Sequence, residues 1–568
     1  MRRAGVFLGG RVGSVALVVL DVELTRRAFV QRGFGGVRYT APPLDWRRSL
    51  RRGFDLSLVI ALLLCIARFT FADRPAEREL RFWINTRDRG IEAALRAFER
   101  QNPGVRIVVS LYRDGRESQK LMTAIAGGDP PDVVIQDRFT VGEWASRGAF
   151  LALDDLIAAT GQTDRPLDPD DFYHTCLAEA MYDGRIYAIP YNTDVRALYY
   201  NESLLRKAGL VDADGNVVPP RDWDELREYA IKLTERDATG RLVTLGFAPN
   251  WGNSWLYLYG WLNGGRFMSD DGRTVLLNEP AIVEALAYMD GLYRAVGGVQ
   301  AVDAFIGSAS GAEFDPFVTG RVAMVINGDW YTNVITQYHP SLPFRVAAPP
   351  APRGRTSVTW SGGFSYVIPT TSGQPELAFE LIRYLVSDEG FGVINEVNAQ
   401  YAASRGRAYV PQMSAQPKVN EWVFERYMMN DPRIPDRVKA AQPLFRSLMT
   451  VSRFRPVTPV GQLLWDEHVR AIEEVVRGGR DPQVVLDIAT AKVQRRLDEL
   501  LDDRAGTAVN WRPILLTSSV GVVVLLGGAI AVVLRRSARS HHGAEARAAL
   551  VFVSPWVIGF LGFTLGPV

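Results

Sequence analysis

A long apolar run near the carboxyl end of the chain constrains its architecture more than any other feature. The run covers 514–534 without a charged residue, and the basic stretch 535–547 follows it. About 20 residues that rise about 1.5 Å each match the roughly 30 Å hydrocarbon core of a bilayer, so we expect a transmembrane helix here. Because positive residues stay on the cytoplasmic side, 535–547 is predicted to be a cytoplasmic loop and the large preceding region to lie outside.

The amino-terminal end carries a second membrane signal. Four arginines within 47–52 precede the apolar stretch Leu56 to Ala67, and the small residue Ala72 follows. A charged region, a short apolar core and a small exit residue are typical of a secretory signal or signal anchor. We therefore expect an N-terminal cytoplasmic extension over 1–53, a signal or signal anchor over 54–72 and an exported domain over 73–503.

Composition limits what the exported domain can be. The chain has 568 residues, of which 47% are hydrophobic, which is enough for two lobes with large cores. The 65 basic and 63 acidic residues nearly balance, so no basic surface for nucleic acid is expected. The five histidines show no spacing typical of a zinc site, and we predict neither a metal nor another cofactor. Cys176 is the only cysteine of the exported domain, which excludes an internal disulfide.

Strand-like and helical runs alternate from residue 79 onward. Apolar strand-like runs cover 80–84, 105–111 and 133–135, and the amphipathic stretches 91–98 and 118–126 separate them. Strands separated by helices favour an α/β fold with a parallel sheet covered on both faces. Further helices are predicted at 223–235, 281–295, 375–386 and 465–476.

An ordered set of motifs gives the exported domain a family resemblance. The motifs include Asn102-Pro103-Gly104, Gly128-Asp129-Pro130-Pro131-Asp132, Asp183-Gly184-Arg185-Ile186-Tyr187, Leu198-Tyr199-Tyr200-Asn201 and Asn327-Gly328-Asp329-Trp330. In this order they resemble extracellular solute-binding proteins of the maltose-binding type, over roughly 79–500. The resemblance implies a two-lobed periplasmic-binding-protein fold of the α/β class, with a hinge and an interlobe cleft that most often takes a carbohydrate.

Residues suited to a carbohydrate site follow from the matched motifs and from the chemistry of sugars. Sugars stack their apolar faces on aromatic rings and offer hydroxyls to amides, carboxylates and close backbone amides. Strand ends and the matched turns supply the polar positions, and tryptophans supply the rings. The candidate ligand-binding residues are Trp83, Asn85, Gln136, Asp137, Asn192, Asp194, Trp251, Trp255, Asp329, Trp330, Trp360, Gly362 and Gly363. Each ring could instead belong to the core, and each polar residue could cap a helix or close a turn.

The last segment of the chain carries a second resemblance. Residues 548–568, with Ser554-Pro555-Trp556 and Gly566-Pro567, resemble the first shared helix of sugar-type ABC transporter permeases. This implies a binding domain tethered to the membrane and fused to the start of a truncated permease domain. The expected partners are an ABC permease subunit and, through it, a cytoplasmic ATPase, and the tether would raise the effective concentration of the binding domain.

Two other functions stay open at the level of sequence. An exported enzyme acting on glycans could use a pair of carboxylates across a cleft, and carboxylates are plentiful here. A membrane sensor could signal through the 514–534 span, although it would need a signalling module after Arg539, where a hydrophobic segment follows instead. The ordered motifs favour a binding protein of an ABC importer over both.

Overall fold

The computed structural model describes residues 78–112, 117–162, 166–307, 311–503 and 528. The predicted segments 1–53, 54–72, 514–534, 535–547 and 548–568 lie outside these residues, except for residue 528. Within the described ranges no helix has both the length and the apolar character that a membrane span needs. The fold therefore concerns the predicted exported domain.

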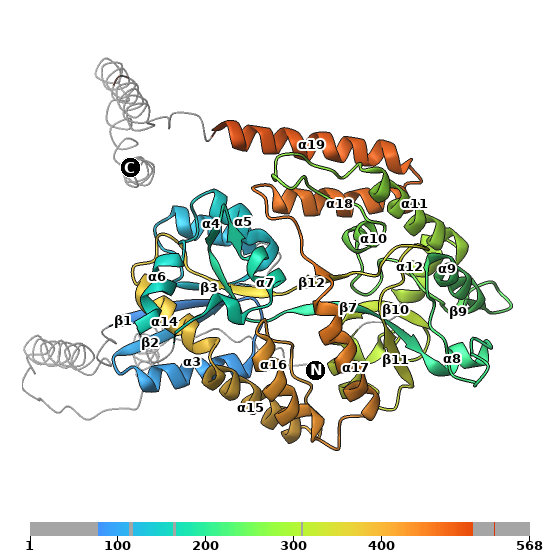
Figure 1. Cartoon of the computed structure of the whole chain (residues 1–568), viewed down its shortest axis with the longest axis horizontal. Helices are drawn as coiled ribbons and strands as arrows, with labels where there is room; N and C mark the ends of the chain where they lie inside the picture. Colours follow the sequence, from blue (N-terminus) through green and yellow to red (C-terminus); the bar gives the residue numbers. More distant parts are fainter. Residues whose placement is uncertain (1–77, 113–116, 163–165, 308–310, 504–527, 529–568) are drawn as a thin grey trace, which may run out of the picture. The chain divides into compact units, whose positions relative to one another are not determined.

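The first sheet has five strands in the order β2-β1-β3-β13-β6 (Figure 1). These strands are β1 (Arg78–Ile84), β2 (Val105–Leu111), β3 (Val133–Asp137), β6 (Ala188–Pro190) and β13 (Phe364–Val367). β1 pairs in parallel with β2 and β3, whereas β13 pairs antiparallel with β3 and β6. The predicted parallel pairing is confirmed for β1, β2 and β3, but the sheet as a whole is mixed, because β13 returns from the second half of the chain and runs against its neighbours.

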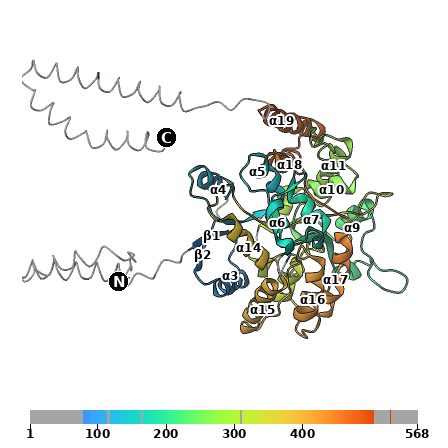
Figure 2. The same ribbon diagram turned by 60° about the vertical axis from the view of Figure 1, so that its left-hand side comes forward.

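Helices cover the first sheet and complete what we call lobe 1 (Figure 2). They are α3 (Arg89–Gln101), α4 (Glu117–Ala126), α5 (Val141–Ser146), α6 (Asp154–Ala159), α7 (His174–Glu179), α14 (Pro375–Leu385) and α15 (Asp388–Ser404). In α3 the buried residues Ile91, Leu95 and Phe98 recur at helical spacing. Asp88 caps this helix by accepting a 3.0 Å hydrogen bond from the Ile91 amide. Both α14 and α15 pack against α3.

The second sheet is built around one long buried strand. Its strands are β7 (Asp194–Asn201), β10 (Met324–Gly328), β11 (Phe344–Ala347), β12 (Thr359–Gly362) and β14 (Ser452–Arg453). β7 pairs antiparallel with β10, β11 and β12, and β12 pairs in parallel with β14. Every residue of β7 after Asp194 is buried, as expected for a central strand covered on both faces.

The second sheet and its helices form lobe 2. The helices are α8 (Glu202–Lys207), α9 (Trp223–Lys232), α10 (Leu256–Leu262), α11 (Pro280–Ala295), α12 (Val299–Ile306), α13 (Tyr331–Tyr338), α17 (Asp436–Met449), α18 (Gly461–Val476) and α19 (Pro482–Asp503). The remaining short elements are β4 (Met181–Tyr182), β5 (Arg185–Ile186), β8 (Glu235–Arg236), β9 (Leu242–Thr244), α16 (Pro417–Phe424), η1 (Arg138–Thr140), η2 (Thr160–Gln162), η3 (Pro169–Asp171), η4 (Ala312–Phe314) and η5 (Glu425–Met429). The helices predicted from sequence between residues 91 and 476 are present, with ends that shift by a few residues.

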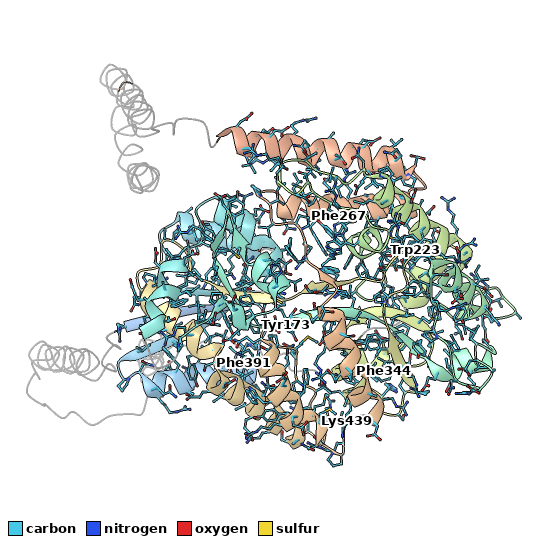
Figure 3. All side chains as sticks on the ribbon, in the orientation of Figure 1. Tyr173, Trp223, Phe267, Phe344, Phe391 and Lys439 are labelled. Carbon is cyan, nitrogen blue, oxygen red and sulfur yellow. The ribbon has the colours of Figure 1, made fainter. Side chains whose placement is uncertain are left out.

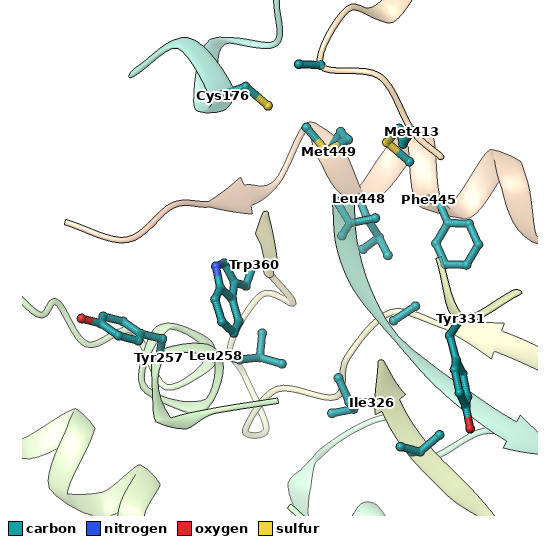
Figure 4. Close-up of a cluster of buried hydrophobic side chains, with 14 of the residues drawn as sticks. Cys176, Tyr257, Leu258, Ile326, Tyr331, Trp360, Met413, Phe445, Leu448 and Met449 are labelled. Atoms are coloured by element: carbon teal, nitrogen blue, oxygen red, sulfur yellow. The ribbon is translucent and has the colours of Figure 1, made fainter. Parts of the chain in front are cut away.

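Buried aromatic rings are a large part of both cores (Figure 3). In lobe 2, Trp223 stacks on Tyr288 with ring centroids 4.0 Å apart. In Figure 4, Phe445 of α17 lies next to Tyr331 of lobe 2, Met413 lies beside Met449, and Leu448 and Ile326 lie farther apart. All of these side chains belong to one apolar cluster that extends through both lobes.

Two passages of the chain between the lobes, which we call the crossings, lie at adjacent positions; a third passage leads from α15 of lobe 1 to α17 of lobe 2. Residues 191–193 connect β6 of lobe 1 to β7 of lobe 2, and Gly363 connects β12 back to β13. A 2.8 Å hydrogen bond from the Phe364 amide to Asn192 Oδ1 joins the two crossings. A Cβ on Gly363, whose φ is 132°, would lie 2.5 Å from the Asn192 carbonyl oxygen, so the second crossing requires glycine. Two short crossings side by side form the kind of connection about which lobes rotate.

Candidate functional site: a cavity between the two lobes

A cavity of about 490 Å³ lies where the two lobes and their crossings meet. The end of β3 and η1 bound it from lobe 1, and β7, the end of β10 and β12 bound it from lobe 2. Its size is in the range of ligand sites that enclose small molecules. We call it the central cavity, and its lining residues are Asp137, Phe139, Asn192, Thr193, Asp194, Arg196, Asn253, Trp255, Asp329, Trp330, Trp360, Gly362, Gly363, Phe364, Gln412, Met413, Arg455 and Trp465.

Four tryptophans line the central cavity, and they are not equally available to a ligand. Trp360 is 2% exposed and carries the Arg196 guanidinium 4.0 Å from its ring centroid. The ring centroid of Trp465 of α18 lies 5.7 Å from that of Trp255 and 6.0 Å from that of Trp360. Trp330, by contrast, is 37% exposed and lies two residues after the end of β10. Trp330 is therefore the ring best placed to stack on a ligand, with Trp255 next.

A glycine makes room for the Trp330 ring. A Cβ at Gly328 would lie 2.1 Å from Trp330 Nε1 and 2.5 Å from Trp330 Cδ1, which no side chain tolerates. The Asn-Gly-Asp-Trp motif thus has a local explanation, because its glycine lets the indole lie over the backbone at the end of β10.

Two arginines hold two of the cavity's carboxylates. Arg455 Nη2 lies 2.8 Å from Asp137 Oδ1, and Arg455 Nε lies 3.1 Å from Glu179 Oε1. Arg196 pairs with Asp194, and the same carboxylate accepts a 2.7 Å hydrogen bond from the Gly362 amide. Each of these two carboxylates is therefore fixed in orientation before any ligand arrives.

Asp329 is the third carboxyl group of the central cavity, and it forms no ion pair with any residue of the described ranges. Its Oδ1 accepts a 3.1 Å hydrogen bond from the Val195 amide, and the residue is only 5% exposed. Burial, followed by the charge of Asp194, raises the pKa of Asp329 to about 7. Near neutral pH this group can donate a hydrogen bond as well as accept one.

A fully buried arginine ties lobe 1 to both crossings. Arg138 of η1 is 0% exposed, and its Nε lies 3.2 Å from Glu179 Oε2. Its Nη1 donates to the carbonyl oxygens of Asn192, at 2.6 Å, and Phe364, at 3.4 Å, and its Nη2 donates to that of Gly362. Glu179 thus lies between Arg138 and Arg455, and this cluster connects the crossings to the floor of the central cavity.

The structure brings nine of the thirteen predicted residues together in the central cavity. They are Asp137, Asn192, Asp194, Trp255, Asp329, Trp330, Trp360, Gly362 and Gly363. These nine residues therefore line one space that both lobes and the crossings bound.

The other four predicted residues lie elsewhere. Asn85 lines a second cavity of about 900 Å³, and Trp83 lines an open pocket beside α4. Gln136 is buried and donates to Thr140 Oγ1 at 2.5 Å, so it closes the turn after β3. Trp251 is half-buried and packs against the core of lobe 2. The alternatives left open by the sequence therefore apply to two of them: Trp251 is a ring packed on the core, and Gln136 is a polar residue that closes a turn.

Sequence reasoning missed three cavity residues that carry much of the chemistry. Arg196 stands two positions after the predicted Asp194 on β7. Because side chains point to alternate faces along a strand, this spacing could have placed Arg196 on the same face as Asp194. Arg455 and Trp465 come from the last part of the domain, in and after the stretch that follows β14. No local pattern marks them, because only the fold brings that stretch to the cavity.

Known proteins resemble this chain in sequence and in fold. A protein of Brucella abortus is 25% identical over 71% of this chain and 88% of its own length. The maltodextrin-binding protein of Bacillus subtilis is 24% identical over 63% of this chain and 82% of its own length. A solved structure with mannobiose bound has a TM-score of 0.59 and 22% identity, covering 73% of this chain and all of the other, which shows a common fold.

A family profile matches the larger part of the chain. It covers residues 84–390, which include the strands of both sheets except β14 and all of β1 but Ile84, and its description is bacterial extracellular solute-binding protein. The match exceeds half of the chain and agrees with the two-lobed α/β fold. The chain belongs to the family of bacterial extracellular solute-binding proteins.

Proposed function

We propose that this chain captures a carbohydrate in the central cavity and is the binding component of an ABC importer. The observation that carries the proposal is the partly exposed ring of Trp330, which lines the same cavity as carboxylates held in fixed orientation by Arg196 and Arg455. An aromatic face beside carboxylates and amides is the arrangement that a sugar ring requires. The names of relatives, which include maltodextrin-binding and lactose-binding proteins, support the same ligand class.

Closure of the lobes is the mechanism we infer for capture. The two crossings at 191–193 and Gly363 are short, and the cavity takes residues from both lobes. A ligand that contacts both lobes stabilises the closed arrangement over the open one by its extra contacts in that state. Catalysis is not needed for this role, and the chain is proposed to release the sugar unchanged.

Delivery to a permease belongs to the same proposal. The family is described as extracellular, which fits a binding domain outside the cytoplasm. The apolar runs 514–534 and 548–568 support a membrane tether fused to the start of a sugar-type permease, with a signal or signal anchor over 54–72. A permease subunit and its cytoplasmic ATPase are the partners that this arrangement would serve.

A thermal-shift screen of the full chain tests the ligand class. The panel contains mono- and oligosaccharides, with amino acids and polyamines as controls. A ligand at one hundred times its Kd stabilises the folded state by about 2.7 kcal/mol, so we expect a rise in Tm with at least one oligosaccharide and with no control. Cleavage of that sugar during incubation would instead select a glycan-active enzyme, and a shift with amino acids alone would contradict the proposal.

A further inference from the structure

The second cavity, of about 900 Å³, adjoins the central cavity and is lined by both lobes. Lobe 1 contributes the loop after β1 and helix α15, and lobe 2 contributes α13. The two cavities share the lining residues Asn192, Phe364, Gln412 and Met413. At this border Asn192 Nδ2 donates to Gln412 Oε1 at 3.3 Å, and both side chains are accessible. A ligand longer than the central cavity therefore has an adjoining space to enter.

Arginines dominate the charge of the second cavity. Its lining contains four exposed arginines and two acidic residues, namely Arg87, Arg89, Arg405, Arg407, Asp88 and Glu92. Four positive charges against two negative charges leave an excess of two positive charges. None of the four guanidiniums forms an ion pair with any residue that the structure describes, whereas Asp88 already accepts from the Ile91 amide and from Asn398 Nδ2. The guanidiniums are thus available to an anion.

Aromatic rings hold three of these guanidiniums in place. The Arg89 and Arg405 guanidiniums lie 4.4 Å and 5.4 Å from the centroid of the Tyr401 ring of α15. The Arg407 guanidinium lies 5.2 Å from the ring centroid of Tyr338, which belongs to α13 of lobe 2. Stacking on a ring leaves the N–H edge of a guanidinium free to donate to a carboxylate or a phosphate.

The second cavity also offers a buried acceptor. Asn85 Oδ1 is buried and has no hydrogen-bond partner among the described residues, and Asn85 lines this cavity. Buried polar atoms without a partner are rare in folded proteins, and a ligand hydroxyl would satisfy this one. A group with both hydroxyls and negative charge fits the lining better than a simple anion does.

The central cavity, unlike the second cavity, has more carboxyl groups than guanidiniums in its lining. Three carboxyl groups, those of Asp137, Asp194 and Asp329, face it together with the guanidiniums of Arg196 and Arg455. Both of these guanidiniums are already paired with carboxylates, so neither is left as an unpaired cation that could bind an anion. A ligand with one charged end would therefore place that end in the second cavity.

We propose that the second cavity binds the anionic group of an acidic carbohydrate, whose neutral sugar units occupy the central cavity. The anion is a carboxylate or a phosphate on a terminal sugar, since both accept the paired N–H groups of a guanidinium. This inference rests on the proposed carbohydrate function and narrows it to acidic oligosaccharides.

Matched ligands test the inference on the full chain. Maltotriose, mannotriose and cellotriose are each titrated in three forms: neutral, with the terminal primary alcohol oxidised to a uronate, and with that alcohol phosphorylated. We expect one acidic form to bind at least tenfold tighter than its neutral parent at low salt. The ratio should fall toward one as added salt screens the exposed arginines. Preference for the uronate or for the phosphate identifies the anion.

The outcomes separate this inference from the proposed function. Binding of a neutral trisaccharide with equal or weaker binding of both acidic forms would overturn the acidic-ligand inference alone. Binding of none of the nine compounds would contradict both, whereas binding of acidic forms only would support both.

Paired variants locate the anion. The double variant Arg87→Gln/Arg405→Gln should bring the acidic and neutral affinities to within about twofold of each other and leave the neutral affinity unchanged. Arg106→Gln removes an equally exposed charge on β2, which lines neither cavity, and should keep the full preference. An undiminished preference in the double variant, with Tm retained, would place the anion elsewhere and overturn the assignment.

Discussion

At the scale of single residues, aromatic rings of the protein core differ in exposure from the ring of the central cavity that is available to a ligand. Trp360, Tyr257 and Tyr259 are almost fully buried, and Trp360 is covered by Arg196. Trp330 has the exposed face. Replacing it should therefore affect binding far more than folding.

We expect Trp330→Ala to weaken carbohydrate binding by about 1 to 3 kcal/mol while Tm changes little, because a stacking ring is lost and no core cavity is created. Titration calorimetry with the sugar found in the screen measures the change. Trp422→Ala is the matched control, since Trp422 is a half-buried tryptophan of α16 that lines neither cavity, and it should bind normally. Equal affinity for wild type and Trp330→Ala would remove Trp330 from the site.

Asp329 makes the free energy of unfolding of the domain depend on pH, and the direction of its pKa shift fixes the sign. The folded state keeps this proton up to a pKa of about 7, whereas the unperturbed value is 3.8. Between these values the folded state binds more protons than the unfolded state, so the free energy of unfolding falls as pH rises. Relative to Asp329→Asn, the wild type should lose on the order of 2 kcal/mol between pH 5 and pH 7.5. Urea unfolding of both proteins at each pH measures this, and parallel stability curves would refute it.

At the scale of elements, one short turn holds the crossings. Arg138 belongs to η1, yet its guanidinium reaches carbonyl oxygens on both crossings and the carboxylate of Glu179. A buried arginine with this many acceptors is costly to replace, because its removal takes the Arg138 donor away from Glu179 Oε2 and from the Asn192 carbonyl oxygen. The crossings should therefore loosen together when it is lost.

Arg138→Gln should destabilise the domain by about 3 to 5 kcal/mol, and amide hydrogen exchange should speed up at 191–193 and 362–364. Arg147→Gln is the control, because Arg147 is partly exposed and, among the residues that the structure describes, forms an ion pair only with Glu143; its loss should cost less than about 1 kcal/mol. Urea unfolding and exchange measured on the same samples check both effects. A loss below about 1 kcal/mol for Arg138→Gln would mean that the crossings do not depend on this cluster.

The elements also explain which parts of the fold were predictable from sequence. Helices such as α3 and α11 carry an apolar face at helical spacing, and the resemblance of ordered motifs predicted two lobes. The direction of β13 was not predictable, because a local pattern cannot tell from which lobe a strand returns. Residues of the central cavity were predictable where a motif is local, as for Asp329 and Trp330.

The cavity residues that sequence reasoning missed include those whose contacts in the fold lie far away in the sequence. Arg455 pairs with Asp137 across more than half of the domain, and no spacing in the sequence records that contact. Gln136 and Asp137 are adjacent on one strand and point to opposite faces, so only one of them reaches the central cavity. A prediction from strand ends cannot separate such a pair without knowing which face the cavity occupies.

At the scale of the whole molecule, the account requires a ligand that contacts both lobes at once. The central cavity takes its lining from the end of β3 in lobe 1 and from β7, β10 and β12 in lobe 2. Contacts on both sides are what would convert binding into lobe closure, and closure is what a transporter partner could recognise.

Amide hydrogen exchange of the full chain, with and without the oligosaccharide that gives the largest thermal shift, tests this claim most directly. We predict slower exchange in segments of both lobes, at 137–139 in lobe 1 and at 194–196 and 328–330 in lobe 2, together with the crossings between them. Protection confined to one lobe, or protection only at surfaces away from the central cavity, would contradict the account.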